Sequence, residues 1–194
     1  MRLKVSELTK KYADLTVIDN LSFETSDTGF YAITGESGIG KTTLIRLILG
    51  LEKPTSGEIK YLDGDVDKPL KSIRFSGAFQ ENRLSEDFTA FENIKMVNKD
   101  IDETTAKNEF SKLLPVDALN KKVKELSGGM QRRLCIIMSI LHNADLYFFD
   151  EPFAGLDDEN IEKVKKYLYE SLKDKLVFIS VHSAKKLDFC TKIF

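Results

Sequence analysis

The sequence lacks the features that mark several large classes of protein. Its 29 lysines and arginines nearly balance its 31 acidic residues, and this near-neutral charge argues against a nucleic-acid-binding surface. No run reaches the roughly 18 apolar residues of a membrane span, and the first six residues lack the apolar stretch of a secretory signal. The two cysteines, Cys135 and Cys190, lack metal-ligand spacing. They predict reduced thiols and a cytosolic protein rather than a disulfide.

What is present is an ordinary globular composition, 42% hydrophobic over 194 residues, enough for one domain with a sizeable core. The first thirty residues predict short strands broken by polar turns. Downstream, apolar runs and helical periodicity alternate, which predicts a parallel α/β sheet covered on both faces. The predicted strands are residues 30–34, 58–62, 145–150 and 176–181, and the predicted helices are residues 42–49, 130–141 and 157–172. Gly50 is expected to end the first helix, and Asp157 or Asp158 to cap the last.

Residues 81–125 differ from the rest in being highly charged, with amphipathic helical fragments such as 91–97. We interpret them as a helical lobe inserted into a nucleotide-binding core made of residues 1–80 and 126–194. The whole chain, 1–194, is then a single domain without internal repeats.

A glycine-rich loop follows the strand at residues 30–34 and opens the helix after it. Its residues are Gly35, Glu36, Ser37, Gly38, Ile39, Gly40, Lys41 and Thr42, followed by Thr43. The glycines let successive backbone N–H groups curl around an anion, and the helix N-terminus adds a partial positive charge. Lys41 is expected to reach the β- and γ-phosphates of a nucleoside triphosphate, and the Thr42 hydroxyl to bind Mg²⁺.

Two acids, Asp150 and Glu151, end the apolar strand at residues 145–150. At the carboxyl edge of a parallel sheet such groups can reach a bound nucleotide. Asp150 would then hold Mg²⁺, and Glu151 would orient or deprotonate the attacking water. The alternative is a pair of acids that merely terminates a strand.

The segment Leu126-Ser127-Gly128-Gly129-Met130, taken with the phosphate loop and with Asp150-Glu151, resembles the ATP-binding cassette (ABC) ATPases over nearly the whole chain. The resemblance implies an α/β fold: a P-loop NTPase core with a RecA-like parallel sheet flanked by helices, an N-terminal antiparallel β subdomain and an inserted α-helical lobe. It also implies that Ser127, Gly128 and Gly129 bind the γ-phosphate of ATP held by a second copy. The expected assembly is a head-to-tail homodimer around two ATP molecules.

The resemblance implies further site residues. Gln80 matches the Q-loop glutamine that reaches Mg²⁺ and the attacking water, His182 the switch histidine at the γ-phosphate, and Tyr12 the aromatic that stacks on adenine. Residues 154–157 resemble the D-loop at the dimer interface. Each of these three residues could instead have no role in the site: Gln80 as an ordinary glutamine, His182 as a structural histidine and Tyr12 as an ordinary tyrosine.

Some positions depart from the family pattern. Met138 stands where many relatives carry arginine, and Ser183 where aspartate is common. The sequence stops at Phe194, before the family's usual closing strands and helix, so we expect a minimal cassette without a regulatory tail.

The implied function is the ATP-hydrolysing subunit of a prokaryotic ABC transporter, cytoplasmic and peripheral on the inner face of the membrane. Its expected partners are membrane-spanning permease subunits and an extracytoplasmic solute-binding protein, and no nucleic acid. Residues 79–84 and 88–93 resemble import cassettes for nitrate, sulfonate and taurine-type solutes, although lipoprotein- and peptide-export cassettes share this strip. The alternatives are a non-transport ABC ATPase of a DNA, ribosome or cell-division complex, and a regulatory subunit that does not hydrolyse ATP.

Overall fold

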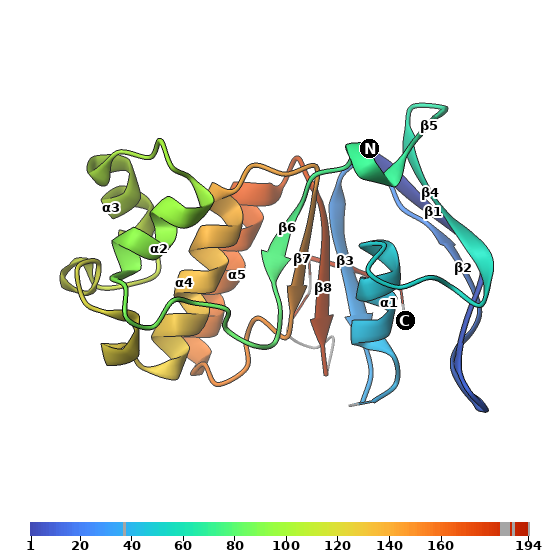
Figure 1. Cartoon of the computed structure of the whole chain (residues 1–194), viewed down its shortest axis with the longest axis horizontal. Helices are drawn as coiled ribbons and strands as arrows, with labels where there is room; N and C mark the ends of the chain where they lie inside the picture. The colour runs from blue at the N-terminus through green and yellow to red at the C-terminus, as the bar shows by residue number, and fades with distance from the viewer. Residues whose placement is uncertain (37, 183–186, 188, 194) are drawn as a thin grey trace. The chain divides into compact units, whose positions relative to one another are not determined.

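A computed structural model describes residues 1–36, 38–182, 187 and 189–193. The chain folds into two compact units, each described here by itself (Figure 1). The first unit comprises Met1–Phe75, Ala144–Asp150 and Asp174–Phe194, and the second comprises Ser76–Asn143 and Glu151–Lys173. The division into a core and a lobe inserted at residues 81–125 stays a prediction.

The first unit contains the antiparallel sheet that the family resemblance implied. Its strands are β1 (Arg2–Tyr12), β2 (Leu15–Glu24), β4 (Ser56–Asp63) and β5 (Val66–Lys68), in the order β2-β1-β4-β5. The prediction of short strands was wrong, because β1 and β2 run for 11 and 10 residues. Bulges hide this length in the sequence: both pairings of β1 shift register near Glu7, whose φ of 49° breaks the two-residue alternation.

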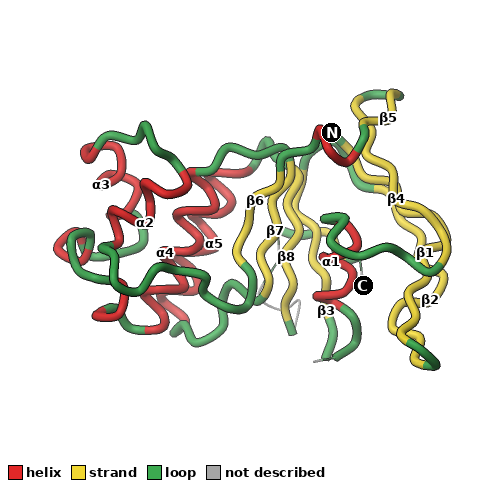
Figure 2. The backbone as a smooth tube through the Cα atoms, viewed as in Figure 1, coloured by secondary structure: helices red, strands yellow, loops and turns green. Residues whose placement is uncertain are grey.

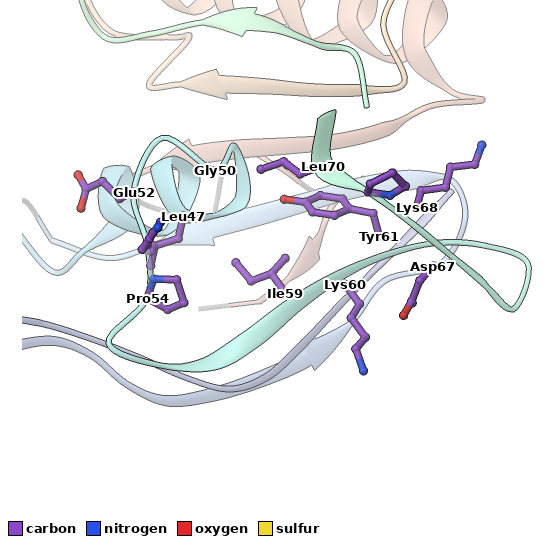
Figure 3. Close-up of a pocket in the computed structure, with 12 residues that line it drawn as sticks. Leu47, Gly50, Glu52, Pro54, Ile59, Lys60, Tyr61, Asp67, Lys68 and Leu70 are labelled. Carbon is purple, nitrogen blue, oxygen red and sulfur yellow. The ribbon is translucent and has the colours of Figure 1, made fainter. Parts of the chain in front are cut away.

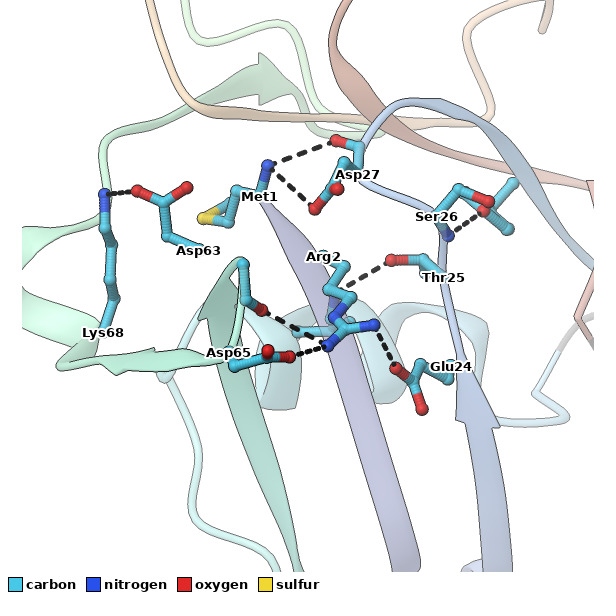
Figure 4. Close-up of polar contacts among 12 residues, drawn as sticks. Met1, Arg2, Glu24, Thr25, Ser26, Asp27, Asp63, Asp65 and Lys68 are labelled. Carbon is cyan, nitrogen blue, oxygen red and sulfur yellow. Dashed lines mark hydrogen bonds and ion pairs between the residues drawn. The ribbon is translucent and has the colours of Figure 1, made fainter.

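Ion pairs fasten the start of β1 to its neighbours (Figure 4). The Arg2 guanidinium lies 3.3 Å from a Glu24 carboxylate oxygen on β2 and 3.0 Å from one of Asp65 in the β4–β5 turn. The Leu3 amide donates to the Thr25 hydroxyl at 2.8 Å, in the buried part of the sheet. These bonds hold the first residues of the chain to the neighbouring segments of the sheet.

The parallel sheet of the first unit has the order β7-β8-β3-β9. Its strands are β3 (Gly29–Thr34), β7 (Leu146–Asp150), β8 (Leu176–Val181) and β9 (Thr191–Lys192). Every residue of β7 and β8 is buried, as their unbroken apolar runs predicted. β9, only two residues long, was not predicted.

Helix α1 (Lys41–Ile48) follows β3 and buries four of its apolar side chains. Gly50 ends it as predicted, with a φ of 66° that suits glycine. A β-carbon at this position would lie 2.1 Å from Leu70 Cδ2, in the short 3₁₀ helix η1 (Leu70–Ser72), so a larger residue would also make the Leu70 side chain shift.

The second unit is mainly helical (Figure 2). After β6 (Phe75–Ala78), its elements are α2 (Ala90–Val97), α3 (Glu103–Ser111), the 3₁₀ turns η2 (Val116–Ala118) and η3 (Val123–Glu125), α4 (Gly128–Leu141) and α5 (Asp158–Leu172). Side-chain caps define the helix starts: Thr89 and Glu92 form a capping box on α2, and Asp157 caps α5 as predicted. Within the part of the chain that the structure describes, no helix has both the length and the apolar character to cross a bilayer.

Candidate nucleotide-binding site

The strand register brings the predicted phosphate groups to one edge of the parallel sheet. Thr34, the last residue of β3, pairs with Val181 on β8, and Asp150 on β7 pairs with Ser180. The chain therefore leaves β3 into the phosphate loop, residues 35–42, at the edge where Asp150 ends β7 and His182 follows β8. Carboxyl ends of parallel strands are the usual ligand edge of an α/β sheet.

The glycines of the phosphate loop hold backbone conformations that residues with a side chain rarely adopt. Gly35 has a φ of 146° and Gly40, the N-cap of α1, has a φ of 108°. A β-carbon on Gly35 would lie 2.8 Å from Ile39 Cγ2, and one on Gly40 would lie 2.9 Å from Val17 Cγ1. Ser37, predicted to bind phosphate, lies outside the described residues.

Lys41 begins α1 and is only 6% exposed. Its ammonium donates to the carbonyl oxygens of Gly35 at 2.6 Å and of Glu36 at 3.0 Å. The positive charge therefore lies inside the curl of the loop, where oxygens of a phosphate chain could replace these two carbonyls.

Asp150 joins the first helix to two strands. Its side chain, 2% exposed, accepts a hydrogen bond from the Thr42 hydroxyl at 3.0 Å and a second one from the Ser180 hydroxyl. Sequence reasoning missed Ser180, although its place one residue before the end of the strand opposite Asp150 could have indicated it. A buried carboxylate next to a threonine hydroxyl fits Mg²⁺, which takes one or two protein oxygens and completes its shell with water and phosphate.

Glu151 begins the second segment of the other unit and has an unusual backbone. Its φ of 51° places a non-glycine residue in the left-handed region, which costs free energy. Its carbonyl accepts from the Ala154 amide at 3.1 Å, forming the tight turn that follows β7. Residues held in sparsely populated backbone regions cluster at functional sites, which is consistent with the predicted role of Glu151.

The exposed Tyr12 side chain lies at the end of β1, in the first unit. Its hydroxyl donates to the Glu52 carboxylate, and the Lys10 ammonium lies 4.7 Å from the ring centroid. This hydrogen bond is the main cause that raises the pKa of the Tyr12 hydroxyl and lowers the pKa of the Glu52 carboxyl. Tyr12 is 43% exposed, so part of its ring remains available for stacking.

In the second unit, the signature segment (residues 126–130) opens α4. The Ser127 hydroxyl caps the helix by accepting from the Met130 amide at 3.3 Å, and Gly128 is exposed. A β-carbon on Gly128 would meet no described atom within 4 Å, whereas one on Gly129 would lie 3.2 Å from Leu156 in the predicted D-loop. The described first turn of α4 carries no acidic side chain, so the helix N-terminus favours an anion.

Gln80 is exposed in the second unit, and its backbone is held by a residue that sequence reasoning missed. Arg132 on α4, 4% exposed, donates to the Phe79 carbonyl, to the Gln80 carbonyl at 3.4 Å and to Asn82 Oδ1 at 3.5 Å. The neighbouring Arg133 donates elsewhere, to Leu113 and Asn160. No pattern in the sequence distinguishes the roles of these two adjacent arginines.

The structure thus brings Lys41, Thr42 and Asp150 to one sheet edge of the first unit, where His182 follows β8. Gln80, Glu151 and the signature segment belong to the second unit, and their roles stay predictions.

A cavity of about 470 Å³ lies elsewhere, at the opposite end of α1 from the phosphate loop (Figure 3). Its lining includes the apolar residues Ile59, Tyr61 and Leu70 and the charged residues Lys60, Asp67 and Lys68. The lining also includes Leu47 and Gly50 at the far end of α1 and none of the phosphate-loop residues 35–42, so the cavity does not belong to the candidate site.

Comparison with known proteins places this chain. The family described as ABC transporter matches residues 18–154, which is most of the chain. The chain is 36% identical over 190 residues to the ATP-binding protein BexA of Haemophilus influenzae, covering 93% of this chain and 82% of BexA. It is 31% identical over 191 residues to the aliphatic sulfonates import ATP-binding protein SsuB of Bacillus cereus, covering 93% and 75%. The chain belongs to the ABC transporter family.

Solved structures agree on the fold. A protein from Pyrococcus furiosus described as an ABC transporter ATP-binding protein superposes with a TM-score of 0.87 at 27% identity, covering 100% of this chain and 98% of that one. The fold predicted from the sequence is confirmed. The chain spans 63%, 49% and 50% of the length of three other curated relatives that it matches.

Proposed function

We propose that this protein is the ATP-hydrolysing subunit of a prokaryotic ABC transporter. The observation that carries the proposal is the bond from Thr42 at the start of α1 to Asp150 at the end of β7, next to the ammonium of Lys41 inside the phosphate loop. These groups match what ATP and Mg²⁺ require: donors and a positive charge for phosphate, and two hard oxygens for the metal.

The roles of the residues follow from their chemistry. Thr42 and Asp150 would hold Mg²⁺, which when bound neutralises charge on the phosphate oxygens. Lys41 would exchange its two carbonyl partners for phosphate oxygens, with amides of residues 35–43 donating beside it. Glu151 would accept the proton of the attacking water, and Gln80 would orient that water. His182 would donate to the γ-phosphate, and Tyr12 would stack on adenine.

A second copy of the chain would complete each site. Ser127, Gly128 and Gly129 combine a capping hydroxyl with an exposed helix N-terminus, and such groups bind anions. We propose that they bind the γ-phosphate on the partner, giving a homodimer around two ATP molecules. Permease subunits would hold this dimer peripherally on the inner face of the membrane.

We assign the protein to import systems on the basis of residues 79–84 and 88–93 and of the similarity of the chain to the sulfonate import protein SsuB. Co-purification from detergent-solubilised cells tests this. Recovery of a permease together with a solute-binding protein supports import, and a permease without one supports export. Recovery of ribosomes or nucleic acid without any membrane protein would instead favour a non-transport ATPase.

Glu151→Gln is the variant that tests the hydrolytic mechanism. Removing the general base should lower ATP turnover by about 10²-fold or more, while ATP still binds and the dimer persists in gel filtration. Glu159→Gln is a matched control, since Glu159 is an exposed residue of α5 that pairs with Lys163. If Glu151→Gln turns over ATP at the wild-type rate, Glu151 is not the base.

A further inference from the structure

The Tyr12 ring is held by residues of the first unit. Its hydroxyl donates to the Glu52 carboxylate. The Lys10 ammonium lies over the ring at 4.7 Å from its centroid. Lys10 thereby occupies one face of the ring, and a stacking partner would have to use the opposite face.

Glu52 is in turn fastened to the end of α1. Its amide donates to the Arg46 carbonyl at 3.3 Å, and its carboxylate lies 3.4 Å from Arg46 Nε and 3.4 Å from Lys10 Nζ. The Glu52 side chain is 19% exposed, so these contacts are partly shielded from water. Figure 3 labels Glu52 beside the loop that follows α1.

The rest of this loop fastens the end of β1 in the same way. The Lys10 ammonium donates to the Lys53 carbonyl at 2.9 Å, and the Lys11 amide donates to the Thr55 hydroxyl at 2.9 Å. The Thr55 amide donates back to the Thr9 carbonyl at 2.8 Å. A continuous set of bonds therefore runs from the phosphate loop along α1 to Glu52 and from there to Tyr12.

We propose that Glu52 is a positioning residue, which sets the Tyr12 ring at a fixed place relative to the phosphate loop so that one nucleotide engages both. The inference rests on the proposed function, in which Tyr12 receives the adenine base. A ring that is already held in place loses less conformational entropy when a base stacks on it than a mobile ring does. The Glu52 carboxylate therefore contributes to affinity without touching the nucleotide.

The test compares a ligand that has a base with one that has none. Dissociation constants of ATP and of inorganic tripolyphosphate, both with Mg²⁺, are measured on the full chain. Glu52→Ala should weaken ATP about fivefold and leave tripolyphosphate unchanged, because only ATP uses the ring. Glu52→Gln, which can still accept from the tyrosine hydroxyl, should restore most of the loss. Glu58→Ala, which removes an exposed glutamate of β4 paired with Lys60, should change neither.

Tyr12→Phe separates positioning from support of the fold. It keeps the ring but removes the bond to Glu52, so it should reproduce the effect of Glu52→Ala, and the double variant should be no weaker than either single one. Equal weakening of ATP and tripolyphosphate by Glu52→Ala would overturn the proposal and show that Glu52 merely supports the loop.

Tyr12→Ala distinguishes the two ways to fail. If it weakens ATP relative to tripolyphosphate while Glu52→Ala does not, Glu52 has no positioning role and the base site stands. If Tyr12→Ala does not affect ATP selectively, the base site assigned to Tyr12 is wrong and the role of Glu52 falls with it. Wild-type protein that binds neither ligand would contradict the proposed nucleotide function itself.

Discussion

The phosphate loop of the first unit and the signature segment of the second both lie at a helix N-terminus, yet they hold their polar groups differently. In the phosphate loop, Lys41 is buried and bonded to carbonyls of its own loop, and Asp150 accepts from two hydroxyls. In the signature segment, Ser127 makes a single capping bond and Gly128 is exposed. The first arrangement is stabilised within the chain, whereas the second presents its donors outward, as a surface that serves another molecule would.

The largest loss of turnover is expected at the phosphate site, where the polar groups are hydrogen-bonded within the chain. Asp150→Asn replaces one acceptor oxygen by an NH₂ group, so one of the two hydroxyls loses its acceptor and the proposed Mg²⁺ ligand loses its charge. Turnover should fall by 10²-fold or more, by the scale of metal-site charge effects. Thermal unfolding should show a loss of about 1–3 kcal/mol.

Ser180→Ala is the companion measurement for Asp150. It removes one donor and leaves the carboxylate in place, so it should cost about 1 kcal/mol of stability and affect turnover far less. Equal losses of turnover in the two variants would show that Asp150 acts through the fold alone.

We expect a different outcome for Gly128→Ala, in the exposed signature segment. No described atom lies within 4 Å of the added methyl group, and Gly128 is not among the glycines with positive φ, so the fold should tolerate it. The methyl group would nevertheless stand between the helix N-terminus and a partner's phosphate. We expect unchanged ATP binding by the monomer and turnover reduced about tenfold, or about 1.4 kcal/mol of lost stabilisation. A drop in melting temperature equal to that of Gly129→Ala would contradict this distinction.

Arg132 tests whether the second unit also has an internally held part. Arg132→Ala removes buried donors to Phe79, Gln80 and Asn82, and should destabilise the unit by about 2–3 kcal/mol. Hydrogen exchange should speed up at residues 79–82. Arg133→Ala is the matched control: it releases Leu113 and Asn160 and should leave exchange at residues 79–82 unchanged. Identical exchange patterns in the two variants would refute a specific role of Arg132.

The smallest effect, with no expected cost to activity, concerns Cys135 inside α4. Burial raises the pKa of this thiol from its usual 9 to about 11. In a Cys190→Ser variant at pH 8, alkylation of native protein should be about 100-fold slower than alkylation of unfolded protein. The native rate should rise with pH until about pH 11, because the thiolate appears two pH units later than in the unfolded chain. A native rate that levels off near pH 9 would show that α4 opens readily.

The sequence alone predicted the elements whose chemistry is local. Buried strands β7 and β8, the glycine stop at Gly50 and the cap at Asp157 each have a signal within a few residues, and the structure confirms them. The signature, phosphate-loop and Asp150-Glu151 motifs predicted the family because their spacing is specific. The length of β1 was missed, since a bulge at Glu7 interrupts the alternation on which strand prediction depends.

Contacts between distant segments left no signal of that kind. Ser180 reaches Asp150 across 30 residues, Glu52 reaches Tyr12 across 40, and Arg132 reaches Phe79 across 53. A serine in a strand, a glutamate in a loop and one of two adjacent arginines look ordinary until the fold brings their partners to them. Glu151→Gln and Gly128→Ala test the predicted roles of Glu151 and the signature segment, and those of Gln80 and His182 stay predictions.

The two carbonyl bonds of Lys41 bear on how the loop discriminates among nucleotides. A phosphate chain that takes the place of the Gly35 and Glu36 oxygens on the ammonium breaks two hydrogen bonds and must replace both of them. A monophosphate has few oxygens that can accept hydrogen bonds in place of the two carbonyls, and a triphosphate has many. The loop should therefore bind long phosphate chains more tightly than short ones. The selectivity would come from this exchange of hydrogen bonds at Lys41 and not from a steric barrier.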